Sequence, residues 1–453
     1  MTKESIESEA NLIIVGDVLT SGNVQTKIIK THKKASSNKA SSNCCFIKRA
    51  NCSLYRITAL GIALLIVICA CFVIETIHDT KYIDEAANYG NNDEITLDPK
   101  HDQTYHKELV DFINKKANST WKARYNRFAT QSKYIFEHVI TRSDSNHRPK
   151  NFDISKGSKE ELLGDTLEHV KNLIDSTGGL VLPKHFDSRE RWPLCRTIHL
   201  PLQQGSCGSC SIVSTAAVLS DRICINTNGT FQPQISIEDL LSCSSASCSG
   251  SNFAYTPIHY WITDGIVTGG PYGSYEGCKP YTISANCGAP CVLNFDSLNR
   301  ELKCVKKCVS TYSKSYQEDL IKGKSGYWLK AGKYHTRFSK DFAVLSYMVE
   351  QSIGYEELIK RELYLNGPLL ACLSIHDEFQ HYDRGIYQEN TYQNSTTLYG
   401  HCMKLIGYGV ENEEKYFVYA NTWGSNWGSD NGYVKISTKF LPEEVIGAIY
   451  VKE

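Results

Sequence analysis

The stretch QQGSCGSCSIVSTAAVLSDRICI, from Gln203 to Ile225, decides the fold of this chain. Two glycines early in the stretch allow a tight approach of the backbone, and an apolar stripe then begins at helical spacing. The stripe consists of Ile212, Ala216, Leu219 and Ile223. This spacing predicts a helix that starts near Cys210. Backbone N–H groups and the helix dipole stabilise anions at a helix amino terminus, so Cys210 is a candidate for a reactive thiolate.

The alternative is that Cys210 is half of a disulfide. Cys207 stands three residues earlier, and two cysteines at this spacing rarely form a disulfide with each other. The two residues must therefore be assigned separately. A nucleophilic cysteine also needs a base and a group that orients the base. YGHCMKLIGYG supplies His401 and VYANTWGSNWGSDNGYVKI supplies Asn421. Because the chain has 14 histidines, His401 taken alone would more often be structural.

The composition is that of a globular protein with several structural units. The chain has 453 residues, of which 41% are hydrophobic and 22% are charged. Lys+Arg and Asp+Glu are both 49, so the formal net charge is zero and a basic nucleic-acid binder has no support. Eighteen cysteines against three methionines indicate an oxidising compartment, a metal site or both.

The segment from Ile57 to Ile74 has 18 residues without a charge, which is near the length that a membrane-spanning helix needs. A cleaved signal peptide and a buried core helix are the alternatives. Residues 27–56 hold eight basic residues and no acid, whereas residues 75–100 hold seven acids and two lysines. This asymmetry predicts a type II single-pass membrane protein with a luminal or extracellular carboxyl-terminal part. The location expected for that part is endolysosomal, or secreted after processing.

The rest of the chain divides by pattern. An acidic stretch rich in Asn and Gly predicts an exposed stalk, and two amphipathic stretches, HKELVDFINKKANSTWKARYNRF and KEELLGDTLEHVKNLI, predict helices. STGGLVLP then breaks the pattern, and the last third alternates apolar and polar residues as antiparallel strands do. The predicted parts are a cytoplasmic tail (1–56), a membrane anchor (57–74), a stalk (75–105), a helical segment (106–180) and a catalytic domain (181–453).

Thirteen cysteines follow the predicted anchor. This odd number leaves one candidate for a reactive thiol if the others pair. Three sequons, at Asn118, Asn228 and Asn394, are candidate glycosylation sites and are compatible with a luminal domain.

The chain resembles the papain family of cysteine proteases, and within it the cathepsin B branch, over about His106 to Val451. The resemblance rests on QGSCGSC, SDRICI, LPKHFDSRERWPLC, DGIVTGGPYGSYEGCKPY, GH, YGVEN and NTWGSNWG, in this order. It implies a papain-like two-domain α+β fold, with a helical left domain around Cys210 and an antiparallel β-barrel right domain carrying His401 and Asn421. It also implies that residues 106–180 form a propeptide that blocks the cleft and is released near Ser176 to Pro183.

The resemblance assigns roles to five residues. It implies that Cys210 is the nucleophile, His401 the general base and acid, and Asn421 the group that orients His401. Gln204 would donate to the oxyanion beside the Cys210 N–H group, and Trp423 would cover the His–Asn hydrogen bond, although core packing also explains a tryptophan there.

The resemblance further implies disulfides Cys195–Cys224, Cys207–Cys248, Cys243–Cys304, Cys278–Cys308 and Cys287–Cys291. Cys372 and Cys402 then remain as buried thiols. No metal and no organic cofactor is implied. His376, Asp377, His381 and Asp383 match no zinc motif and are interpreted as strand and loop surface.

The departures from the family pattern bear on activity. Ser211 stands where the family has an aromatic residue, and SGSNF after Cys248 replaces a glycine pair that borders the substrate. SANCGAPCV is short and has no histidine where cathepsin B has a His-His loop, which favours endopeptidase action over carboxydipeptidase action. Ser325–Ile353 is longer than its counterpart.

Two functions from different classes remain. The first is a membrane-tethered zymogen of a cathepsin B-like cysteine endopeptidase, whose partners are protein or peptide substrates, its own propeptide as inhibitor, and the membrane. The second is a catalytically weakened relative that acts as a luminal or extracellular binding protein.

Overall fold

The computed structural model describes residues 103–126, 158–205, 207–244, 246–248, 254–284, 302–332, 340–389 and 397–452. All of them belong to one compact unit, Ile95–Glu453. The α-helices are α2 (Gln103–Lys115), α4 (Ser158–Ser176), α5 (Ser188–Arg191), α6 (Cys210–Asn226), α7 (Ile237–Cys243), α8 (Thr256–Thr263), α11 (Lys340–Ser352) and α12 (Gly354–Asn366). The 3₁₀ helices are η3 (Arg196–His199) and η4 (Asp377–His381).

The strands are β1 (Trp121–Ala123), β2 (Phe186–Asp187), β3 (Ser325–Lys330), β4 (Leu369–His376), β5 (Tyr382–Tyr387), β6 (Thr397–Glu411), β7 (Glu414–Ala420), β8 (Tyr433–Ser437) and β9 (Glu444–Ile449). They pair in the order β1-β5-β8-β7-β6-β4-β9-β3, with β2 added on β6. The described strands therefore follow an open order, and no pairing among them closes the antiparallel β-barrel that was expected for the right domain. The pair β5–β8 is parallel, and the others are antiparallel.

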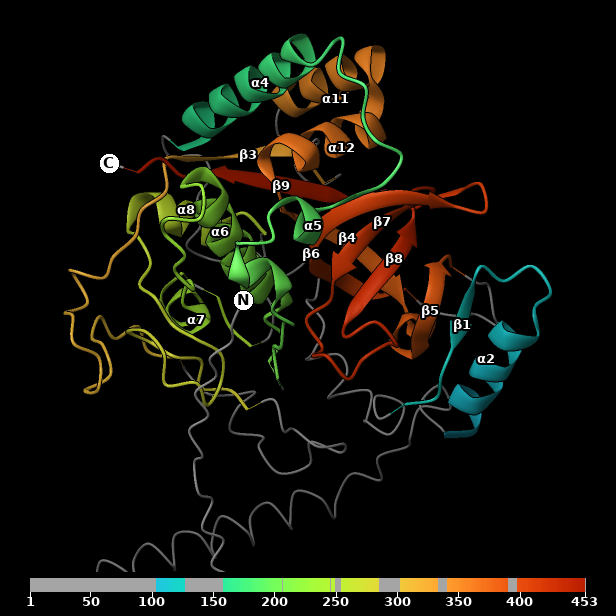
Figure 1. The fold of residues 1–453 in the computed structure, drawn as a ribbon, viewed down its shortest axis with the longest axis horizontal. Helices are drawn as coiled ribbons and strands as arrows, with labels where there is room; N and C mark the ends of the chain where they lie inside the picture. Colours follow the sequence, from blue (N-terminus) through green and yellow to red (C-terminus); the bar gives the residue numbers. More distant parts are fainter. Residues whose placement is uncertain are drawn as a thin grey trace, which may run out of the picture. The chain divides into compact units, whose positions relative to one another are not determined.

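Helix α6 begins at Cys210, as the apolar stripe predicts. All four residues of the stripe are buried, and the helix packs against β4, β6 and β9. Figure 1 shows α6, α7 and α8 on one side of the sheet and α4, α11 and α12 stacked near β3 and β9. The architecture is therefore a helical part beside a largely antiparallel sheet, which is the α+β arrangement expected from the sequence.

The long segment Ser325–Ile353 becomes strand β3 and helix α11, which packs on α12 and α4. Gly367 ends α12 with a φ of +89°, a conformation that side chains rarely adopt. A Cβ at this position would also lie 2.4 Å from Ile225 Cδ1 on α6. The turn from α12 into β4 therefore requires glycine.

A buried ion pair joins the helical part to the sheet. Lys404 Nζ on β6 lies 2.8 Å from Asp221 Oδ2 on α6, and both side chains are 0% exposed. Thr197 donates its hydroxyl to the other carboxylate oxygen over 2.6 Å. The pair fixes the helix that begins at Cys210 against the strand that carries His401.

The membrane anchor predicted at 57–74 lies outside the described residues. Among the residues that the structure does describe, no helix is long and apolar enough to cross a bilayer. This finding contradicts the predicted type II membrane localisation as far as the described residues go.

Replacing Lys404 should strongly destabilise the fold, because it leaves Asp221 as a buried and uncompensated charge. For Lys404→Met in a Cys210→Ala background, which prevents self-digestion, we expect a loss of about 3–5 kcal/mol in the free energy of unfolding by urea. Lys435→Met is the matched control, since Lys435 lies 2.8 Å from Glu411 but both side chains are more than a third exposed. Its cost should be below about 1 kcal/mol. Equal costs for the two variants would contradict the role given to the buried pair.

Candidate active site

Cys210 is the first residue of α6 and is fully buried. The loop before it is held in place by several contacts. Gly205 has a φ of +66°, and a Cβ there would lie 2.7 Å from the Ser284 carbonyl oxygen. Gly208 donates its N–H to the Cys248 carbonyl over 2.8 Å, next to the Cys207–Cys248 disulfide. The backbone that leads to the thiol is therefore tightly constrained, as the two glycines suggest.

The imidazole of His401 is oriented by Asn421. His401 Nε2 lies 2.8 Å from Asn421 Oδ1, and both residues are buried. The same Oδ1 accepts the Thr422 backbone N–H over 2.8 Å, which identifies this atom as the oxygen of the amide. His401 Nε2 must then be the donor, so that the neutral ring carries its lone pair on Nδ1. Within the described ranges, Nδ1 has no hydrogen-bond partner, so it can accept a proton.

Two sets of contacts bring the Cys210 and His401 segments together. Ser214, one turn after Cys210 on α6, donates its hydroxyl to the Cys402 carbonyl over 3.1 Å. Residues i and i+4 share a helix face, so the face of α6 that bears Cys210 meets β6 next to His401. On the other side, Gln204 donates its backbone N–H to Thr422 O over 2.9 Å. The loop before the thiol is thereby paired with the segment that carries Asn421.

Gln204 is buried beside this junction. Its side-chain Nε2 donates to the Cys207 carbonyl over 2.7 Å, and Thr422 donates its hydroxyl to Gln204 Oε1. Tyr281 donates its hydroxyl to the Gln204 carbonyl over 2.9 Å. An amide nitrogen has two hydrogens, and Cys207 takes one of them. The side chain is thus held with its nitrogen toward the loop that leads to the thiol.

Trp423 packs beside the imidazole of His401. Its ring lies 4.8 Å from the His401 ring, and 1% of the residue is exposed. Phe379 and Trp427 pack against Trp423 at 5.8 and 5.3 Å. The aromatic group shields the His401–Asn421 hydrogen bond from water, and it is also ordinary core packing.

Ten of the described cysteines form five disulfides. Four are the pairs that the resemblance implies: Cys195–Cys224, Cys207–Cys248, Cys243–Cys304 and Cys278–Cys308. The fifth joins Cys372 to Cys402 and corrects the expectation of two buried thiols. These residues are direct register partners on β4 and β6, so their side chains lie on the same face of the sheet. Cys287–Cys291 lies outside the described residues, and Cys210 is in no disulfide.

The structure also places the candidate glycosylation sites, Ser211 and the polar residues between His376 and Asp383. Asn118 and Asn228 are exposed, and Asn394 lies outside the described residues. Ser211 is buried, and its hydroxyl has no hydrogen-bond partner among the described residues. Asp377, His381 and Asp383 were expected at the surface but are at most 6% exposed, because the segment 103–126 covers them. His376 is half-buried and pairs with Glu389 at 2.9 Å.

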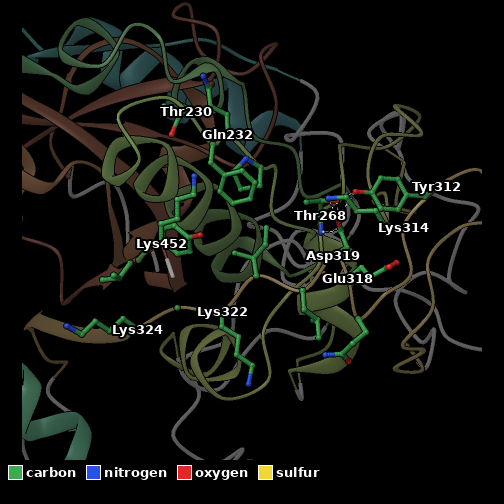
Figure 2. A pocket seen from close by; sticks show the side chains of 18 residues that line it. Thr230, Gln232, Thr268, Tyr312, Lys314, Glu318, Asp319, Lys322, Lys324 and Lys452 are labelled. Carbon is green, nitrogen blue, oxygen red and sulfur yellow. Dashed lines mark hydrogen bonds and ion pairs between the residues drawn. The ribbon is translucent and has the colours of Figure 1, made fainter.

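The structure also contains a pocket of about 1040 Å³ away from these residues (Figure 2). Four lysines line it, together with two acidic side chains: Asp319 is bonded by Thr268 and Tyr312, and Glu318 by Ser315. None of the predicted catalytic residues lines this pocket. In the ranges that the structure describes, no three His, Cys, Asp or Glu side chains are grouped as metal ligands would be.

The chain belongs to the papain family of cysteine proteases, since the model of that family matches residues 182–444, more than half of the chain. It is therefore a cysteine protease, a hydrolase of the cathepsin B-like kind. It is 32% identical over 332 residues to the gut-specific cysteine proteinase of Caenorhabditis elegans, covering 72% of this chain and 84% of that protein.

Two further comparisons agree. The chain is 36% identical over 259 residues to cathepsin B-like cysteine proteinase 3 of Caenorhabditis elegans, a match that spans 56% of this chain and 61% of that protein. Among solved structures, procathepsin B S9 from Trypanosoma congolense superposes with a TM-score of 0.53 at 28% identity. That match covers 76% of this chain and 98% of the other.

The cross-strand disulfide can be tested by peptide mapping without reduction. When the protein is denatured without reduction, alkylated and digested, we expect Cys372 and Cys402 in one linked peptide pair that separates on reduction. We expect an alkyl group on Cys210, which is in no disulfide. Alkylated Cys372 or Cys402 in denatured, unreduced protein would contradict the pairing.

Proposed function

We propose that the chain is the zymogen of a cathepsin B-like cysteine endopeptidase, with Cys210 as nucleophile and His401 as general base and acid. The observation that carries this proposal is the orientation of His401. Its Nε2 is bound to Asn421 Oδ1 at 2.8 Å, which leaves Nδ1 as the basic nitrogen on the strand that meets the start of α6. A nucleophile at a helix start and a base held by a third group are what acyl transfer needs.

The proposed reaction has two halves. His401 takes the proton of the Cys210 thiol, and the thiolate attacks the carbonyl carbon of the substrate peptide. His401 then gives the proton to the leaving amine, and an acyl-thioester forms on Cys210. In the second half, His401 takes a proton from water, which attacks the thioester and releases the acid and the thiol. Gln204 Nε2–H and the Cys210 backbone N–H stabilise the oxyanion in both halves.

The proposal gives the amino-terminal described elements a role as propeptide. Helix α2, strand β1 and helix α4 fall within or beside the range 106–180, and one of the similar solved structures is a proform. The partners are then protein or peptide substrates and the chain's own propeptide. Endopeptidase action is favoured because SANCGAPCV contains no histidine.

Two substitutions test the roles proposed for Cys210 and Gln204. They are made in the catalytic domain, activated by cleavage near Ser176 to Pro183. Cys210→Ala should abolish hydrolysis of a fluorogenic peptide, and Gln204→Ala should lower kcat/KM about 10²–10³-fold through the loss of an oxyanion donor. Gln232→Ala is the matched control and should leave kcat/KM unchanged, since the hydrogen bonds of its amide in the described residues go to the backbone of Arg196 and Gly229. Turnover by Cys210→Ala would sink the proposal, and wild-type activity of Gln204→Ala would remove Gln204 from the site.

A further inference from the structure

Strand β1 pairs with β5 at the edge of the sheet (Figure 1). Helix α2 contacts the 3₁₀ helix η4. Trp121 anchors this contact: 1% of it is exposed, its ring stacks on Tyr382 at 6.2 Å, and its indole N–H donates to Gln388 O over 2.9 Å. Thr120 donates its hydroxyl to Ile386 O over 2.6 Å. Residues 103–126, which we call the prosegment clamp, are therefore attached through both backbone pairing and a buried aromatic side chain.

Two buried histidines meet where α2 contacts η4. His381 Nε2 lies 3.1 Å from His106 Nδ1, and the two residues are 0% and 1% exposed. One nitrogen must donate and the other must accept for this contact to be a hydrogen bond. When both rings are protonated, both nitrogens carry hydrogen and both rings carry positive charge. The contact is thus favourable with at least one neutral ring and repulsive with two charged rings.

The neighbours of the pair do not supply His381 with a counter-charge. Asp377 is bonded by the Tyr105 hydroxyl at 2.6 Å, and Asp383 is paired with Arg124 at 3.2 Å. Within the described ranges, no ion pair involves His381. Tyr105 lies against the His106 ring and Tyr125 stacks on the His381 ring. The elements that meet here carry these further charged or titratable groups: Lys107 and Glu108 on α2, Arg124 after β1, His376 on β4, Asp377 and Glu378 on η4, and Tyr382, Asp383, Arg384 and Tyr387 on β5.

From this geometry we infer that His106 and His381 form an acid-sensitive latch, which holds the prosegment clamp at neutral pH and releases it as the pH falls. The inference rests on the proposed function, in which residues 106–180 are the propeptide of a peptidase. It adds to that function the residues through which acidification would start activation.

The direction of the pH dependence follows from His381. Burial and the charge of His106 lower the pKa of His381 to about 3, although the Arg124 backbone acts in the opposite direction. A histidine released into water titrates near pH 6.5. When the clamp is released, His381 therefore binds a proton that it does not bind when the clamp is docked. Docking is at full strength above about pH 6.5 and weakens below it, by up to about tenfold per pH unit for this one group, until about pH 3.

The other end of the propeptide range should respond differently. His169 on α4 places Nε2 3.0 Å from Glu362 Oε2. Burial alone would raise the pKa of Glu362, but the hydrogen bond from His169 and the charge of Arg222 lower it to about 2. This carboxylate stays ionised between pH 7 and 4, so its contact with His169 is kept in acid. Acid should therefore loosen the prosegment clamp and leave α4 in place.

Hydrogen exchange measured by mass spectrometry on the full chain carrying Cys210→Ala tests the latch without any catalysis. After correction for the pH dependence of intrinsic exchange, amides in 103–126 should lose protection below about pH 6.5. Amides of α4 and β7 should keep theirs at pH 4. Retained protection of 103–126 at pH 4 would overturn the latch, and the peptide hydrolysis assay would still judge the peptidase separately.

The variant with both His106→Leu and His381→Leu should keep 103–126 protected at pH 4, at least tenfold more than the parent. His259→Leu is the control, because it removes a partly buried histidine on α8, outside this contact. The latch would be refuted if residues 103–126 of the double variant lost protection on acidification at the same midpoint pH, and as steeply, as in the parent. If β7 protection at pH 7.5 shows that the double variant is misfolded, His381→Gln supplies the test and should reduce the steepness, because it removes the group that gains the proton.

Discussion

The buried contact between Asp221 and Lys404 is the constraint on which the site depends. It joins α6 to β6 over 2.8 Å, with neither side chain exposed. Cys210 starts that helix and His401 lies three residues before Lys404 on that strand. A thiol and an imidazole on different elements can act together only if the elements cannot shift against each other. Leaving either charge unpaired would be costly, so the two elements are held in one register.

The same helix also connects the site to the propeptide range. Arg222, next to Asp221, donates to Glu362 over 3.0 Å and to the Tyr327 hydroxyl over 2.7 Å, and His169 of α4 reaches the same carboxylate. The prosegment clamp lies at the other end of the sheet and is held by aromatic stacking and by two histidines. The chain thus has two attachments of different chemistry for one propeptide. In our account, a fall in pH loosens the prosegment clamp and leaves the attachment of α4 in place.

Much of this arrangement was predictable from sequence because it depends on local pattern or on the resemblance. The apolar stripe after Cys210 predicted where the helix starts. The family motifs predicted four of the disulfide pairs. Contacts between distant residues were not predictable. Cys372 and Cys402 pair only because β4 and β6 adopt one register, and nothing near either residue reveals that register. His381 was expected at the surface because the residue that packs against it, His106 on α2, is 275 residues away in sequence.

The central claim is that Cys210 and His401 act as one thiolate–imidazolium pair. The rate at which iodoacetamide alkylates Cys210 in the activated domain, measured from pH 4 to 10, tests this directly. The account predicts substantial alkylation at pH 5 in the parent. In His401→Ala the rate should fall about tenfold per pH unit below about pH 8.5, where an ordinary thiol ionises. Identical profiles for parent and variant, both rising near pH 8.5, would contradict the claim.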